Sequence, residues 1–222
     1  MLQAATLKFL KDLRKNNNKA WFDTNRPRYE NAKADFTQFV QSVIDKYGRK
    51  DTGIAHLKAK DCMFRINRDV RFSKDKSPYK TNMGAYFNEE GKKSPLAGYY
   101  FHCEPGKSFV GGGLWMPLPA DLSKVRQEID YNLEAFQKIV ESRRFKALYQ
   151  GLSTDREYIL SRVPKGYESD NPAAAYLKMK SYVATSALSD TELTTPGMVK
   201  KVSEAFETLQ PMVRFLNDAI RN

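Results

Sequence analysis

The residues of this sequence best suited to chemistry lie at positions 62–82, which read C-M-F-R-I-N-R-D-V-R-F-S-K-D-K-S-P-Y-K-T-N. Guanidinium forks and lysine ammonium groups that converge beside the end of a strand suit a phosphate or a carboxylate. The stretch therefore predicts an anion-binding site. The residues expected to contact the ligand are Arg65, Arg68, Arg71, Lys74, Lys76, Tyr79 and Lys80.

A structural interpretation of the same charges stays open. Arg65 and Arg71 can pair with Asp69, Asp75 or a carboxylate from elsewhere, and the lysines can belong to a solvated loop. If the aromatic pair at residues 21–22 lies over the two arginines, these cations are structural.

An enzyme is the second hypothesis for this stretch. A carboxylate between two arginines, as at Asp69, has a low pKa and suits orienting a partner better than general-base work. Tyr79 or His102 can serve as acid or base, although a histidine in a strand is more often a packed side chain. The catalytic candidates are therefore Asp69, Tyr79 and His102.

The sequence contains none of the usual signatures of a cofactor or metal enzyme. It has no nucleophile elbow, no dinucleotide fingerprint and no paired metal-ligand spacing. No metal site is expected, with a carboxylate-only magnesium site left open, and the cofactor is unknown.

A strand is expected to position the first of these cations. From residue 64 to residue 73 apolar and polar side chains alternate, with Arg68 as the exception, and such alternation is typical of a half-buried strand. Ser77-Pro78 predicts a turn after it. The expected apolar face consists of Phe64, Ile66, Val70 and Phe72.

The order of the expected elements predicts an α+β fold in one domain over residues 1–222. An antiparallel meander of about four or more strands is flanked by N-terminal and C-terminal helices. N-terminal helices are expected within about 3–46, the sheet within about 60–116 and C-terminal helices within about 120–221. Besides 64–73, strands are predicted near 82–88, 98–103 and 108–115. Helices are predicted near 3–15, 27–46, 121–142, 145–149, 155–162, 173–180 and from 195 onward, with a kink or break at Pro211.

Several local features predict how these elements end. Asn16-Asn17-Asn18 should stop the first helix and cap the next, and Gly48 should end the second long helix in a left-handed conformation. The glycines at 111–113, inside a predicted strand, favour a bulge or close packing over the approach of a ligand.

The net charge of +11 is concentrated in the N-terminal part of the chain. Residues 1–80 hold 19 Lys and Arg against 9 Asp and Glu, which gives +10 of the total. A basic part joined to a neutral part is typical of a protein with an anionic partner.

Composition and cysteine usage favour a cytoplasmic globular protein with no membrane association. The sequence is 41% hydrophobic, and no apolar run approaches the roughly 20 residues of a membrane span. The N-terminus resembles an amphipathic helix and not a signal peptide. Cys62 and Cys103 form no metal-ligand pattern and are expected to be buried free thiols.

Five segments carry a resemblance to a known family. They are N-N-K-A-W-F (17–22), R-P-R-Y-E (26–30), F-R-I-N-R-D-V-R-F-S-K-D-K-S-P-Y-K-T (64–81), G-Y-Y-F-H (98–102) and P-K-G-Y (164–167). The chain resembles domain-of-unknown-function family 2461, conserved hypothetical proteins of bacteria and fungi. One small departure is Lys-Ala, in place of Lys-Glu, between Asn18 and Trp21. The resemblance implies a single cytosolic α+β domain and implies no reaction.

The first hypothesis is therefore a binding protein for a phosphorylated metabolite, a nucleotide or a nucleic acid. Aromatic residues beside cations would allow bases to stack, but none of the standard nucleic-acid motifs is present. An enzyme that uses the same cluster, and a protein whose basic face docks an acidic partner, are the alternatives. The oligomeric state is open.

Overall fold

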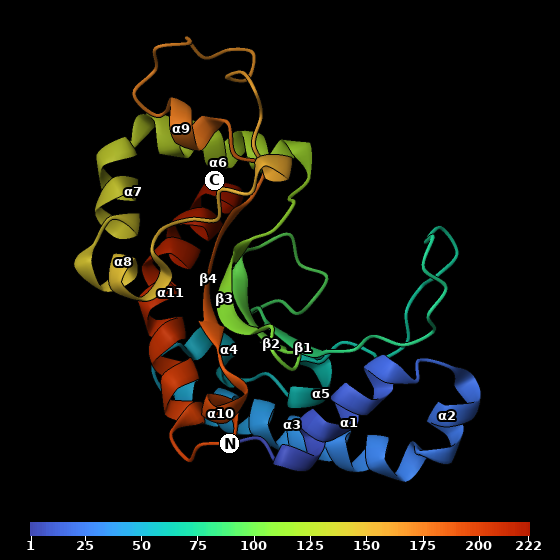
Figure 1. Cartoon of the computed structure of the whole chain (residues 1–222). Helices are drawn as coiled ribbons and strands as arrows, with labels where there is room; N and C mark the ends of the chain where they lie inside the picture. Colours follow the sequence, from blue (N-terminus) through green and yellow to red (C-terminus); the bar gives the residue numbers. More distant parts are fainter. The chain divides into compact units, whose positions relative to one another are not determined.

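Four strands form one antiparallel sheet whose order follows the chain, as expected of a meander in an α+β fold (Figure 1). The computed structural model describes residues 1–222. The strands are β1 (Met83–Phe87), β2 (Gly98–Cys103), β3 (Ser108–Leu114) and β4 (Tyr182–Leu188). The predicted fold class is confirmed.

The chain divides into two compact units, which are described separately below. Unit 1 comprises Met1–Lys92, Tyr100–Val110 and Ala187–Glu204, and unit 2 comprises Lys93–Tyr99, Gly111–Ser186 and Ala205–Asn222. The sequence-based expectation of one domain stays a prediction.

Unit 1 is built from N-terminal helices that pack on β2. Leu10 and Leu13 of the first helix are fully buried, and Phe36 and Phe39 of the third helix contact the Phe101 ring at centroid distances of 6.1 and 4.8 Å. These apolar side chains recur at helical spacing, so one face of each helix is buried. The helices are α1 (Ala4–Lys15), α2 (Lys19–Thr24), α3 (Arg26–Tyr47), α4 (Thr52–Ala55), α5 (Ala59–Cys62), α10 (Asp190–Leu193) and the first turns of α11 (Met198–Arg221).

Helix ends in unit 1 follow the predicted caps with one correction. The Asn18 side chain accepts a hydrogen bond from the Trp21 amide at 3.0 Å and caps α2, as expected. Gly48, however, has φ −56° and is not left-handed. Glycine is needed there for space, because a Cβ would lie 2.8 Å from the Ala55 Cα atom.

The predicted strand over residues 64–73 is wrong. Only Ile66 of its apolar face is buried, while Phe64 is 43% and Phe72 is 95% exposed. Past Arg68 the chain forms no ladder, because Asp69 and Asp75 accept hydrogen bonds from the backbone amides two residues further on. Such turns offer the backbone a local alternative to strand pairing.

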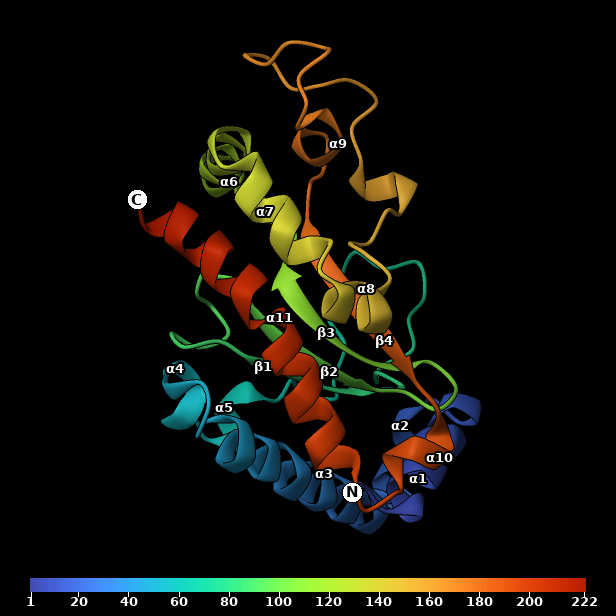
Figure 2. The ribbon, with the colours of Figure 1, turned by 90° about the vertical axis from the view of Figure 1, so that its left-hand side faces the viewer.

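Unit 2 consists of short helices around the C-terminal part of α11. Figure 2 shows α7 and α8 beside this part of α11. Phe136 of α7 contacts Phe215 at 5.1 Å, and the Tyr149 hydroxyl of α8 donates to the Ala205 carbonyl at 2.7 Å. The elements are α6 (Pro119–Tyr131), α7 (Leu133–Val140), α8 (Arg143–Tyr149), the 3-10 turn η1 (Arg156–Tyr158) and α9 (Ala174–Leu177).

Three helix predictions in unit 2 need correction. The helix expected over 121–142 divides into α6 and α7 at Asn132. The helices expected over 155–162 and 173–180 shrink to η1 and α9, because Ile159 and Met179 pair in an isolated β-bridge. α11 runs through Pro211 as a single helix.

Strand β4 was not predicted, and it explains two of the three glycines of β3, while the third, Gly112, packs against the backbone of β2. A Cβ at Gly111 would overlap the Ala184 carbonyl, and one at Gly113 would overlap that of Tyr182. The expectation of close packing at these glycines is confirmed.

No helix of the structure has the length and the apolar character needed to cross a bilayer.

Candidate functional site

The basic loop, residues 64–81, leaves and rejoins unit 1 through a short irregular ribbon (Figure 1). Isolated bridges pair Met63 with Ala85 and Asn67 with Tyr79. Met63 and Asn67 are four positions apart in the sequence, whereas their partners Tyr79 and Ala85 are six positions apart. The returning side of the ribbon therefore contains two extra residues. The resulting bulge carries Thr81 out of the ribbon register.

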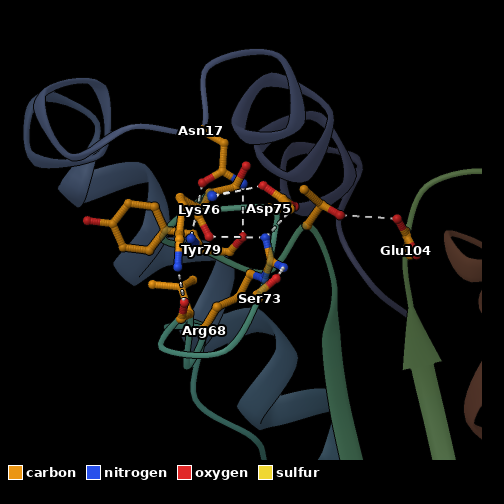
Figure 3. A network of polar contacts seen from close by, with 10 residues as sticks. Asn17, Arg68, Ser73, Asp75, Lys76, Tyr79 and Glu104 are labelled. Atoms are coloured by element: carbon orange, nitrogen blue, oxygen red, sulfur yellow. Dashed lines mark hydrogen bonds and ion pairs between the residues drawn. The ribbon is translucent and has the colours of Figure 1, made fainter.

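Tyr79 anchors the returning side of the basic loop. Its ring is 7% exposed and stacks on Phe22 at a centroid distance of 4.0 Å and an interplanar angle of 15°. The Asn17 side chain bonds both backbone groups of Tyr79, accepting from its N–H at 3.1 Å and donating to its carbonyl at 2.9 Å (Figure 3). Tyr79, a sequence candidate for ligand contact and catalysis, therefore holds the loop in place.

Arg68 cross-links the basic loop internally (Figure 3). Its guanidinium donates to the Asp75 carboxylate at 2.5 Å, to the Ser77 carbonyl at 3.1 Å and to the Ser73 hydroxyl at 3.3 Å. The pKa of Asp75 is lowered to about 2, first by hydrogen bonds from Ser77 and then by Arg68. Arg68 is thus committed to the structure of the loop.

Two further cations of the loop also have internal partners. Arg71 forms a bidentate pair with Asp69 at 2.9 and 2.7 Å, and this arginine lowers the pKa of the Asp69 carboxyl. The Lys76 ammonium donates to the Val70 carbonyl at 3.0 Å. Arg71 therefore has the ion pair that the structural interpretation of the sequence expected, Arg68 has one as well, and Lys76 is held by a backbone carbonyl.

The remaining charge forms a cation cluster, in which Lys80 and Lys92 lie over the ring of Phe64 and Arg65 lies close enough to Lys80 to affect its pKa. The Lys80 and Lys92 ammonium groups lie 5.5 and 5.6 Å from the centroid of this half-exposed ring. Lys92 also donates to the Met63 carbonyl. The pKa of Lys80 is lowered, first by burial and then by repulsion from the Arg65 guanidinium. Lys74 is exposed and is not among the cations that contact the Phe64 ring.

A polar relay at the end of β2 adjoins the cation cluster. Tyr100 and His102 occupy alternate positions and so share one face of the strand, and Glu104 follows two residues later, just past the end of β2. The Tyr100 hydroxyl lies 3.1 Å from His102 Nδ1, and His102 Nε2 lies 3.4 Å from the Glu104 carboxylate. The other Glu104 oxygen accepts a hydrogen bond from the Thr81 hydroxyl at 3.1 Å, which links the relay to the bulge of the basic loop.

Burial sets the protonation states of the relay. It raises the pKa of Tyr100 to about 12 and lowers the pKa of His102, an effect that Glu104 partly offsets. The His102 ring stacks on Phe109 at 4.7 Å and 14°. At neutral pH the relay therefore contains a protonated tyrosine and a neutral histidine.

Aromatic contact places the relay beside the cation cluster. The Phe64 and Tyr100 rings meet edge to face at 6.2 Å. Of the sequence candidates, the structure groups Arg65, Lys80 and His102 here, while Asp69 and Arg71 pair with each other on the loop. Sequence reasoning missed Tyr100, Glu104, Thr81 and Lys92. The alternation Y-x-H-x-E over residues 100–104 was the available signal for the first two.

No group of three or more His, Cys, Asp or Glu side chains is placed to hold a metal ion.

A family model described as "Conserved hypothetical protein (DUF2461)" matches residues 5–215. The chain belongs to domain-of-unknown-function family 2461. The resemblance seen in the sequence is confirmed, and the matched range of family 2461 includes the basic loop, the cation cluster and the relay. Searches of the curated proteins and of the solved structures found no match to this chain.

Proposed function

We propose that this member of family 2461 binds a phosphate-containing small anion at the cation cluster. The observation that supports this most is the position of two ammonium groups, Lys80 and Lys92, over the half-exposed Phe64 ring, with the Arg65 guanidinium near enough to help lower the pKa of Lys80. Bringing like charges together costs free energy, and an anion that bridges them recovers it. Arg68 and Arg71, by contrast, already have carboxylate partners.

The chemistry of the cluster favours phosphate. A guanidinium fork can bond two phosphate oxygens at once, and lysine ammonium groups act as point charges around the same group. The half-exposed Phe64 ring offers an apolar surface for the rest of the ligand. A cytoplasmic location belongs to this proposal and is supported by the two buried free cysteines.

Calorimetric titration with inorganic pyrophosphate and with ADP tests the proposal. Lys80→Gln should weaken binding by roughly 10- to 150-fold, since a hydrogen bond to a charged group contributes roughly 1.5–3 kcal/mol. Lys74→Gln is the matched control, because it removes the same charge from the same loop without touching the cluster. Equal loss in both variants would show nonspecific attraction, and no binding by the wild type would refute the proposal.

A nucleic acid is the second candidate ligand, and Phe72 is the observation that favours it. Its ring is 95% exposed in a basic loop, with the Arg71 guanidinium 5.8 Å from its centroid. An exposed ring beside cations suits stacking on an unpaired base.

Fluorescence polarisation with labelled single-stranded DNA and RNA, at low and physiological salt, separates the two candidates. Nucleic-acid binding requires a steep loss of affinity with salt and a further loss in Phe72→Ala. Pyrophosphate binding with no oligonucleotide binding would leave the small anion as the ligand.

A further inference from the structure

We propose that Tyr100 is a catalytic acid–base residue, which takes a proton from a hydroxyl group of the anion held at the cation cluster and passes its own proton to His102. The inference rests on the proposed function and adds a reaction class to it. The protein would be an enzyme whose first chemical step is the deprotonation of a bound hydroxyl compound.

The hydrogen-bond chain sets the direction of proton transfer. A Glu104 carboxylate offers acceptor oxygens, so His102 carries its proton on Nε2, facing Glu104 at 3.4 Å. The Nδ1 lone pair then accepts the Tyr100 hydroxyl proton across 3.1 Å. Such bonds are often long in an unliganded enzyme and shorten when substrate binds.

The step balances in protons and charge. The substrate O–H bond breaks and its proton joins the Tyr100 oxygen, while the original Tyr100 proton moves to His102 Nδ1. The electron pair of the broken bond stays on the substrate oxygen. Glu104 faces the new imidazolium cation across 3.4 Å, and in this proposal the cations of the cluster hold the anion whose oxygen becomes the alkoxide.

Burial explains why the two transfers occur together. A free Tyr100 phenolate is disfavoured at neutral pH, because burial raises its pKa to about 12. His102 is neutral under the same conditions, because burial lowers its pKa. The tyrosine can therefore act as a base only while His102 receives its proton.

The surrounding strands leave space for the Tyr100 hydroxyl. Gly84 of β1 lies against it, and a Cβ at that position would overlap the hydroxyl oxygen. Phe109 supports the His102 ring from the neighbouring strand. Tyr100 as a whole is only partly buried, and its ring meets the half-exposed Phe64 ring of the cation cluster at 6.2 Å.

A tyrosine-directed reagent tests the proposal without knowledge of the substrate. With 4-(fluorosulfonyl)benzoate, the Tyr100 oxygen attacks sulfur, the S–O bond forms, fluoride leaves and the proton passes to His102. Mass spectrometry follows labelling at Tyr100 and at Tyr131, whose 73% exposure makes it the internal reference. We expect Tyr100 to react faster than Tyr131, at a rate that rises with pH through the His102 pKa.

Two variants distinguish catalysis from packing. His102→Gln should slow Tyr100 labelling on the order of 100-fold, the usual contribution of a general base, with Tyr131 labelling unchanged. Glu104 is a positioning residue. Glu104→Gln should move the midpoint of the pH profile to lower pH, because Glu104 raises the pKa of His102. Preferential labelling that survives His102→Gln, or no preference for Tyr100, overturns the proposal.

This design tests the proton relay and the anion site independently of each other. Lys80→Gln should slow labelling by the carboxylated reagent and leave labelling by the neutral phenylmethanesulfonyl fluoride unchanged. If Lys80→Gln affects neither reagent, the anionic substrate class is wrong while a His102-dependent reaction still supports the relay. If His102→Gln does not fold, Glu104→Gln, which keeps the size of the side chain, carries the test through its pH profile.

Discussion

Replacing Asn17 by alanine should destabilise unit 1 more than replacing its neighbour Asn16. Tyr79 pairs with Asn67 across the ribbon in a β-bridge. Its backbone N–H and carbonyl both bond the side-chain amide of Asn17. The Asn17 side-chain amide thus supplies one acceptor and one donor to the Tyr79 backbone, as a neighbouring strand would. The Asn16 amide, by contrast, makes one exposed hydrogen bond to the Asp12 carbonyl of its own helix.

The magnitudes follow from the number of bonds and from burial. Asn17→Ala removes two part-buried hydrogen bonds and leaves a backbone N–H and carbonyl without partners, which should cost about 2–3 kcal/mol. Asn16→Ala removes one bond that water can replace, and should cost about 0.5–1 kcal/mol.

Urea unfolding followed by circular dichroism measures the two costs, and amide hydrogen exchange at Tyr79 localises the effect. The Tyr79 amide should exchange faster in Asn17→Ala and remain protected in Asn16→Ala. Since Lys80 follows Tyr79, pyrophosphate affinity should also fall only in Asn17→Ala. Equal destabilisation by the two substitutions would refute the proposed anchoring of the basic loop.

Three further predictions concern the relay and the cysteines. Gly84→Ala should destabilise the protein by about 1–3 kcal/mol in urea unfolding, because its Cβ overlaps the relay tyrosine; Gly197→Ala, with no atom near the added Cβ, is the control, and equal effects would contradict the overlap. His102 has a folded pKa below its ordinary 6.5, so its contribution to stability is full above pH 6.5 and is lost as the pH falls through the folded value. The difference in unfolding free energy between wild type and His102→Gln should shrink from pH 8 to pH 5, and a constant difference would exclude this linkage. Burial raises the pKa of Cys62 to about 11 and of Cys103 to about 12, so both thiols should react with Ellman's reagent at pH 8 only after unfolding; rapid reaction of the native protein would contradict their burial.

Periodic segments of the sequence were sufficient to predict most of the fold. Helical spacing located α1 and α3, and alternation with turn residues located the first three strands of the meander. These patterns are local, because each helix or strand buries one face and the spacing of its own apolar residues indicates which face that is. β4 was not predicted because Y-V-A-T-S-A-L is rich in small residues, and because its packing against the β3 glycines joins segments about 70 residues apart.

The basic loop shows why alternation alone can mislead. Residues 64–73 have the pattern of a strand, but a strand needs a partner strand to pair with. Here Asp69 and Asp75 accept hydrogen bonds from backbone amides two residues further on, in place of a partner strand. Composition drew attention to the cations of this stretch, and their role in binding stays a prediction. It contained no information on which of them have carboxylate partners, since that depends on side-chain direction in the folded chain.

The sequence by itself determined the fold class, the family and the concentration of positive charge in the first 80 residues. Only the tertiary structure decided that Arg68 and Arg71 are paired within the loop, and that Lys80 and Lys92 meet over Phe64. It also placed Thr81 against the Glu104 end of the relay. The physical reason is that charge and periodicity are properties of single segments, whereas pairing, burial and the resulting pKa shifts depend on which segments meet.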